Sequence, residues 1–226
     1  MKNKHLKSMC RKLLQGVADT RGTLSNQQVF QRIMKNVAGR DLAYSGDKED
    51  RREYFHDKEY LLRIVRILAS PLQDALIARM WLAAGELDTY GDDIDIGDLF
   101  LPYHTKWNNE NLTDKAWRRG QAETMRLGID PVLVWPWRHS RLYEVLALIG
   151  ENRPYGEWEQ DDIGHDLTVV MPVRIGVLGS GGNHSIATGI AMRTGEVKTK
   201  NAYDLSVLYP IVHSDGRGVA PEKWST

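Results

Sequence analysis

The sequence of 226 residues has a single cysteine, Cys10. One cysteine excludes an intramolecular disulfide and any zinc site built from several thiolates. The chain also has no excess of either charge, because 30 basic and 30 acidic side chains balance. A balanced charge creates no global field toward nucleic acid or an anionic membrane, so a DNA partner is not supported by net charge.

Long hydrophobic runs are missing as well. No stretch approaches the roughly 20 apolar residues of a membrane span. The basic segment 1–16 has no apolar centre of the kind that a signal peptide needs. We therefore expect no membrane partner and a cytoplasmic location. Apolar residues at 42% and seven tryptophans nevertheless supply a substantial core, so a disordered chain is excluded.

Several common catalytic motifs are absent too. The sequence contains no G-x-S-x-G elbow, no P-loop and no H-E-x-x-H pair. The closely spaced glycines of LGSGGN do not match the G-x-G-x-x-G dinucleotide fingerprint. A catalytic or binding site must therefore be inferred from residue patterns other than these motifs.

Residues 1–127 carry mainly helical patterns. Ser25 is suited to cap a helix that Gly39 would end. Pro71 stands at the first position that proline favours and predicts the start of another helix. A further helix is predicted from Thr113 to Gly128, so we expect all substantial strands to lie after about residue 127.

Residues 88–112 interrupt these patterns with a long polar connection. Loops of this length are often functional. Its aspartates are compatible with a metal site but lack the fixed spacing of a calcium-binding loop; they are Asp92, Asp93, Asp95 and Asp98.

From residue 128 the sequence pattern changes to runs of β-branched residues and short helical segments. We therefore predict an α+β protein, in which a helical part (1–127) packs on a small α/β domain (128–226). The two parts could still share one core.

The most informative stretch is 169–195, which predicts strands, a glycine-rich turn and a helix. Gly181 and Gly182 precede Asn183, His184 and Ser185, the first residues of that helix. Free backbone N–H groups at a helix start, reached past glycines without Cβ atoms, are suited to bind an anion. The alternative is structural: the glycines form a tight turn, Asn183 or Ser185 caps the helix, and His184 has an internal partner.

The order of the predicted elements resembles the ParB/sulfiredoxin-like superfamily. The matching parts are the strand 132–136, the helix 141–149, the hairpin 168–178 and the turn 181–184. Members bind nucleotide phosphates at this turn and include CTP-dependent partition proteins, ATP-using sulfiredoxins and ADP-using kinases. The whole chain also resembles uncharacterised bacterial proteins with a GNHS motif, a resemblance that supplies no mechanism.

Two positions depart from the superfamily pattern. Sulfiredoxin chemistry needs a cysteine before the motif histidine, where this chain has Asn183. The superfamily usually has an arginine after the histidine, which can grip phosphate with two hydrogen bonds, and here Ser185 takes its place. Arg174 and Arg193 are the nearest candidates in sequence to replace that charge.

The resemblance leads to a functional hypothesis. We expect a nucleotide- or phosphate-binding protein, using a nucleoside triphosphate or diphosphate with Mg²⁺, and possible phosphoryl-transfer or hydrolytic activity. His184 would contact phosphate or act as a general acid or base, because its ordinary pKa is near neutrality. The alternatives are a non-catalytic DNA-associated regulator, contacting DNA through the helical part, and a protein-interaction module.

Two further clusters allow more than one interpretation. Trp135 and Trp137, with Arg138, could stack a base or could simply pack. A magnesium ion could lie near His165 and its neighbouring carboxylates, although a solvated loop also explains them; these are Asp161, Asp162 and Asp166.

Overall fold

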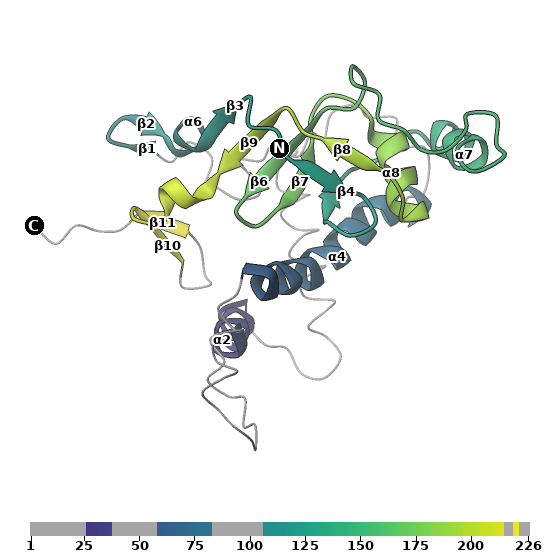
Figure 1. Cartoon of the computed structure of the whole chain (residues 1–226). Coiled ribbons are helices and arrows are strands. Elements are labelled where there is room, and N and C mark those ends of the chain that lie inside the picture. The colour runs from purple at the N-terminus through teal and green to yellow at the C-terminus, as the bar shows by residue number, and fades with distance from the viewer. Residues whose placement is uncertain (1–25, 38–57, 83–105, 215–218, 222–226) are drawn as a thin grey trace, which may run out of the picture.

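The computed structural model describes residues 26–37, 58–82, 106–214 and 219–221 (Figure 1). Its helices are α2 (Asn26–Val37), α4 (Lys58–Leu82), α6 (Leu112–Ala116), α7 (His139–Leu148), α8 (Asn183–Met192) and the 3₁₀ helix η2 (Leu205–Leu208). Its strands are β1 (Lys106–Trp107), β2 (Glu110–Asn111), β3 (Trp117–Arg119), β4 (Thr124–Arg126), β5 (Val132–Leu133), β6 (Leu167–Met171), β7 (Ile175–Leu178), β8 (Glu196–Lys198), β9 (Asn201–Asp204), β10 (Val212–Ser214) and β11 (Val219–Pro221). These helices and mixed strands confirm the α+β class.

A five-stranded sheet of order β3-β9-β6-β7-β5 forms the centre. β6 and β7 form an antiparallel hairpin, while β5 runs parallel to β7 and β9 runs parallel to β6. The β6 sequence LTVVM is buried over four of its five residues, as expected for a central strand covered on both faces. β4 and β8 make a separate two-stranded pair.

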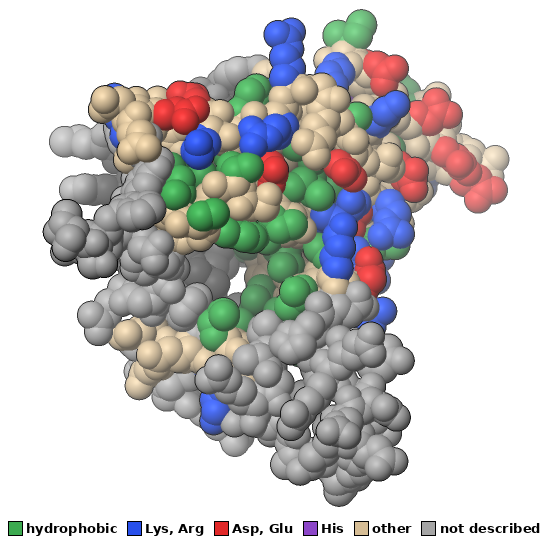
Figure 2. Space-filling model, turned by 60° about the vertical axis from the view of Figure 1, so that its left-hand side comes forward, with side chains coloured by type: hydrophobic (Ala, Val, Ile, Leu, Met, Phe, Trp, Pro, Cys, Tyr) green, Lys and Arg blue, Asp and Glu red, His purple; other side chains and the backbone are tan. Residues whose placement is uncertain are grey.

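α4, α7 and α8 lie toward the β5 end of the sheet. α7 and α8 contact each other there, whereas β1, β2 and α6 lie at the opposite end (Figure 1). α4 contacts β5, and its buried Leu76 belongs to the main core. On the face drawn in Figure 2, hydrophobic side chains gather across the middle, and basic and acidic side chains are interspersed around them.

The prediction that residues up to about 127 are almost wholly helical is wrong for 106–126. The helix predicted from Thr113 to Gly128 ends at Ala116, and β3 and β4 follow it. Gly120 lies between these strands with a φ of 74°, a left-handed conformation that interrupts a helix. Pairing of β3 with β9 and of β4 with β8, distant in sequence, outweighs the local helical pattern. The division into two domains at residue 127 stays a prediction.

Pro71 lies inside α4 and does not begin a new helix. The proline removes one backbone donor, but polar contacts on both sides of it hold the helix in place. Before Pro71, Arg66 Nη2 donates to Asp130 Oδ1 at 2.9 Å. After it, Gln73 Oε1 accepts from the Val132 N–H at 2.7 Å. α2 and α7 match the predicted helices, whereas Ser25 and Gly39 lie outside the described residues. Between β9 and β10 the extended backbone is interrupted by η2.

Asp130 joins α4, β4 and the β6–β7 turn through one buried carboxylate. Arg66 and Arg174 donate to it from 2.9 and 3.3 Å, and the Arg126 N–H donates from 3.0 Å. Burial alone would raise the pKa of Asp130, but the Arg126 hydrogen bond and the charges of Arg174, Arg66 and Arg126 hold it below its usual value. The carboxylate therefore stays charged and paired inside the protein.

Replacing Asp130 by Ala should leave three arginines, Arg66, Arg126 and Arg174, without their shared partner. The Asp130 side chain is 0% exposed, and removing one member of a buried ion pair typically costs about 3–5 kcal/mol. Urea denaturation should show a loss of unfolding free energy of that order. The control is Glu110→Ala, which removes the exposed pair with Lys115 and should cost at most about 1 kcal/mol. Equal losses in the two variants would contradict the assigned role.

Candidate functional site

Three connections meet at one edge of the central sheet. Because β5 and β7 are parallel, segments 134–138 and 179–182 leave the sheet at the same edge. β6 is antiparallel to β7, so segment 161–166 enters the sheet at that edge too. The edge beyond the carboxyl ends of parallel strands is where many α/β proteins bind ligands.

The glycines of the turn allow the chain to pass close to segment 161–166. Gly182 is the N-cap of α8 with a φ of 90°, which L-residues rarely adopt. A Cβ on Gly181 would lie in contact with the Gly164 carbonyl, and a Cβ on Gly182 would be 2.8 Å from His165 Cδ2. The two glycines therefore serve the packing of the turn, in addition to the helix start that the sequence suggested.

Asn183 and His184 fix segment 134–138 to the start of α8. Asn183 Oδ1 accepts a hydrogen bond from the Trp135 N–H at 2.8 Å. His184 Nε2 accepts one from the Arg138 N–H at 3.1 Å. The two side chains thus replace the strand hydrogen bonds that β5, which ends at Leu133, no longer makes.

The His184 ring is neutral at physiological pH. Burial, and to a smaller extent the nearby charges of Arg141 and Arg138, lower its pKa to about 4, against the opposing hydrogen bond from the Arg138 N–H. The ring also meets the Trp137 ring edge-on, with centroids 5.6 Å apart. The protonated histidine that the sequence suggested as a phosphate contact is therefore not the form this geometry favours.

The first turn of α8 keeps its amide groups unengaged. Within the described residues, the backbone N–H groups of Asn183, His184 and Ser185 and the Ser185 hydroxyl have no hydrogen-bond partner. These N–H groups carry the positive end of the helix dipole.

Two arginines stand near this helix start. Arg138 donates its N–H to His184, and Arg141 lies on α7, which contacts α8; the charges of both lower the His184 pKa. The guanidinium of Arg138 lies over Trp137, 4.7 Å from the ring centroid, and makes no ion pair among the described residues. Arg141 pairs with Glu144 at 2.7 Å on the exposed side of α7. Arg138 and Arg141, at the start of α7, thus place positive charge near the start of α8.

His165, Asp161 and Asp166 have structural partners. His165 Nδ1 accepts from the Asp161 N–H at 3.0 Å, and its ring stacks on Trp158 at 5.3 Å. Burial lowers the His165 pKa, with Asp161 opposing. Asp166 accepts from the Ser180 hydroxyl at 3.3 Å. No group of three or more potential metal ligands occurs in the part of the chain that the structure describes.

The arginines suggested from sequence lie elsewhere. Arg174 precedes β7, at the end opposite the glycine turn, where it pairs with Glu123 and Asp130. Arg193 follows the last residue of α8, about 15 Å from the helix start by helical rise. Arg174 is therefore withdrawn from the candidate site, because its guanidinium is engaged at the far edge of the sheet.

Other predicted residues are also placed. Trp135 is 8% exposed and packs in the core, whereas Trp137 is half-buried beside His184. Asp92, Asp93, Asp95 and Asp98 lie outside the described residues.

Sequence reasoning missed Arg141 and Trp158. The sequence indicates only a helix at Arg141, because the approach of this residue to α8 depends on how the two helices pack. Trp158 Nε1 donates to the Ser185 carbonyl at 2.7 Å. A Cβ on Gly195 would collide with the Trp158 ring, and one on Gly189 would collide with Leu127 and lie 3.0 Å from Trp158 Nε1, so these two glycines are the signal that large side chains pack there.

A comparison with known families places the chain. Residues 16–221 match the family described as "Family of unknown function (DUF6710)". The chain belongs to this family. No curated protein and no solved structure matches it. No helix among the described residues is long and apolar enough to cross a membrane. Membership of DUF6710 therefore does not indicate an activity, so the function of the chain must be argued from the candidate site.

The protonation of His184 provides a direct test of this environment. Its pKa of about 4 lies below the ordinary value of 6.5, so the unfolded chain binds the proton more readily. The contribution of His184 to stability should be complete above about pH 6.5 and be lost progressively as the pH falls toward about 4.

NMR titration of the His184 ring should give a midpoint near 4. Denaturation of His184→Gln should show a smaller loss of stability over the same pH window than the wild type. A ring midpoint near 6.5 would show that His184 is exposed and lacks its hydrogen bond from Arg138.

Proposed function

We propose that the start of α8 binds the phosphate of a nucleotide or other phosphate-bearing small molecule. The observation that carries the proposal is the combination of unengaged N–H groups at residues 183–185 with the charges of Arg138 and Arg141 beside them. Directed amides at a helix start and two guanidinium groups are complementary to a phosphate.

The position of this cluster supports the proposal. It lies beyond the carboxyl ends of the parallel strands β5 and β7. The order β5, α7, β6, β7, α8 also agrees with the element order of the ParB/sulfiredoxin resemblance. Arg138 and Arg141 supply the positive charge that Ser185 lacks at the position of the motif arginine.

Trp137 adds a surface suited to a base. Its ring is half-buried and already carries the Arg138 guanidinium on one face. Aromatic rings of this kind stack on nucleobases without regard to their hydrogen-bonding edges. A nucleotide therefore fits the cluster better than inorganic phosphate does, with the base toward Trp137 and the phosphates toward α8.

The geometry favours binding over catalysis by His184. Its Nε2 atom already accepts from the Arg138 N–H, and a pKa of about 4 makes the neutral ring dominant at pH 7. We therefore assign His184 to positioning Arg138, and treat phosphoryl transfer or hydrolysis with Mg²⁺ as a further step that binding must precede.

The ion pair between Arg141 and Glu144 allows a matched pair of variants. Both Arg141→Gln and Glu144→Gln break this 2.7 Å contact, but only the first removes positive charge near α8. Arg141→Gln should weaken nucleotide binding about tenfold to a hundredfold, whereas Glu144→Gln should leave it unchanged or tighter. Calorimetric titration with ATP, CTP, GTP and ADP, with and without Mg²⁺, measures both. No binding by the wild type, or equal weakening by the two variants, would refute the proposal.

Ser185→Asp tests the helix start itself. Ser185 is the third residue of α8, where an acidic side chain interacts favourably with the helix dipole. The variant should unfold no more easily than the wild type, yet its carboxylate should repel phosphate and abolish binding. Thermal unfolding with and without nucleotide separates the two effects. Retained nucleotide stabilisation in Ser185→Asp would place the phosphate away from α8.

A further inference from the structure

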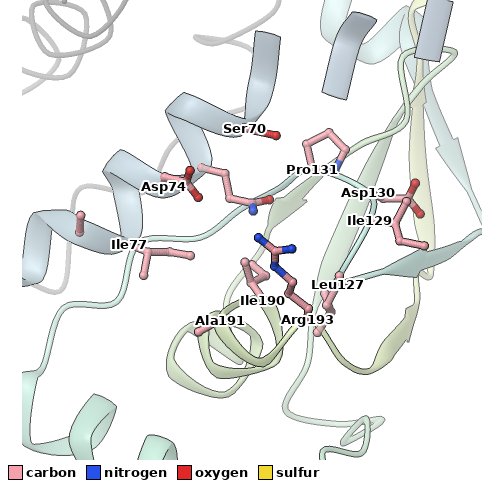
Figure 3. A pocket seen from close by; sticks show the side chains of 13 residues that line it. Ser70, Asp74, Ile77, Leu127, Ile129, Asp130, Pro131, Ile190, Ala191 and Arg193 are labelled. Carbon is pink, nitrogen blue, oxygen red and sulfur yellow. The ribbon is translucent and has the colours of Figure 1, made fainter. Parts of the chain in front are cut away.

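A cavity lies at the other end of α8. It has a volume of about 560 Å³, within the range of small-molecule sites, and lies between α4, segment 127–131 and residues 190–193 (Figure 3). Ile77, Leu127 and Ile190 give it apolar walls. Because α8 is 10 residues long, this cavity is about 15 Å from the helix start discussed above.

Arg193 occupies a backbone position that normally belongs to glycine. Its φ of 54° is left-handed, and the Thr194 N–H closes the helix end by donating to the Gly189 carbonyl at 3.0 Å. Glycine would adopt this conformation with less strain, so the backbone does not explain an arginine here. The side chain offers the reason, because its guanidinium projects into the cavity (Figure 3).

An opposite charge lines the same cavity from α4. Asp74 is one turn after Ser70, and both side chains are on the wall formed by that helix (Figure 3). Within the described residues, neither the Arg193 guanidinium nor the Asp74 carboxylate has a hydrogen bond or an ion pair. Asp130 also lines the cavity, but its carboxylate is already paired with Arg66, Arg126 and Arg174. The cavity therefore offers a ligand one unpaired cation and one unpaired anion between apolar walls.

We propose that this cavity binds a small zwitterion with an apolar side chain, either a free amino acid or a dipeptide. Its carboxylate pairs with Arg193, whose planar fork matches two carboxylate oxygens. Its ammonium group pairs with Asp74, and its side chain contacts Ile77, Leu127 and Ile190. A ligand with only one charge would leave one of the two cavity charges uncompensated.

The test begins with four related probes added to the full chain. L-leucine and L-leucylglycine carry both charges, 4-methylpentanoate lacks the ammonium group, and 3-methylbutylamine lacks the carboxylate. At least one zwitterion should bind with a dissociation constant below about 1 mM by calorimetry, and each single-charge analogue at least about tenfold more weakly. The better of the two zwitterions distinguishes an amino acid from a dipeptide. No saturable binding of either zwitterion, or equal binding of 4-methylpentanoate, would overturn the proposal.

Two variants locate the binding. Arg193→Gly removes the guanidinium and should weaken zwitterion binding about tenfold to a hundredfold, while the relaxed left-handed backbone keeps the unfolding midpoint at or above that of the wild type. Asp74→Asn should weaken L-leucine binding but not the residual binding of 4-methylpentanoate. The control is Arg119→Gln, which neutralises an exposed arginine on β3, at the far edge of the sheet, and should bind as the wild type does. Undiminished binding in Arg193→Gly would exclude this cavity as the site.

Discussion

The buried carboxylate of Asp130 is the interaction on which the arrangement of the layers depends. It receives Arg66 from α4, the Arg126 N–H from the end of β4, and Arg174 from the β6–β7 turn. These three elements are far apart in sequence, and one acidic side chain fixes them relative to the start of β5. Its oxygens accept three charge-assisted or backbone hydrogen bonds, which compensates for its removal from water. The position of α4, and hence one wall of the cavity beside it, follows from this contact.

At the opposite edge of the sheet, beyond the carboxyl ends of β5 and β7, side chains complete the backbone hydrogen bonding. β5 is short, and the segment after it is held by Asn183 and His184 from the neighbouring helix. A histidine that accepts from a backbone N–H must be unprotonated, which agrees with its lowered pKa. The GNHS residues thus have a structural task that leaves their own backbone amides available. The Asn183 and His184 side chains bond to the segment after β5, while the backbone N–H groups of residues 183–185 stay available. The helix start is therefore a candidate for binding.

Much of the α/β part could be predicted from sequence because its signals are local. The β6–β7 hairpin follows from β-branched runs, and α8 follows from the glycines before it. Residues 113–128 have an equally clear helical pattern, but partners 70 or more positions away draw 117–119 and 124–126 into strands. The candidate site likewise contains residues that local sequence signals indicate and residues that only the packing brings there. Its glycines and His184 are visible as a motif, whereas Arg141 belongs to it only through helix packing, and Arg174 is near in sequence but distant across a strand. Proximity along the chain was the wrong guide to which arginine replaces the motif arginine.

The strand order has a consequence for how the protein is made. β3 precedes every other strand of the central sheet in the chain but hydrogen-bonds only to β9, the last of them. During synthesis from the N-terminus, the backbone groups of β3 therefore have no strand partner until residues 201–204 have left the ribosome. The hairpin β6–β7 can form much earlier, since its two strands are nearly adjacent. The sheet is thus completed from its centre outward, and the final pairing closes a loop that contains the helix start at Asn183 and the Arg193 wall of the cavity, while the Asp74 wall lies before it in the chain.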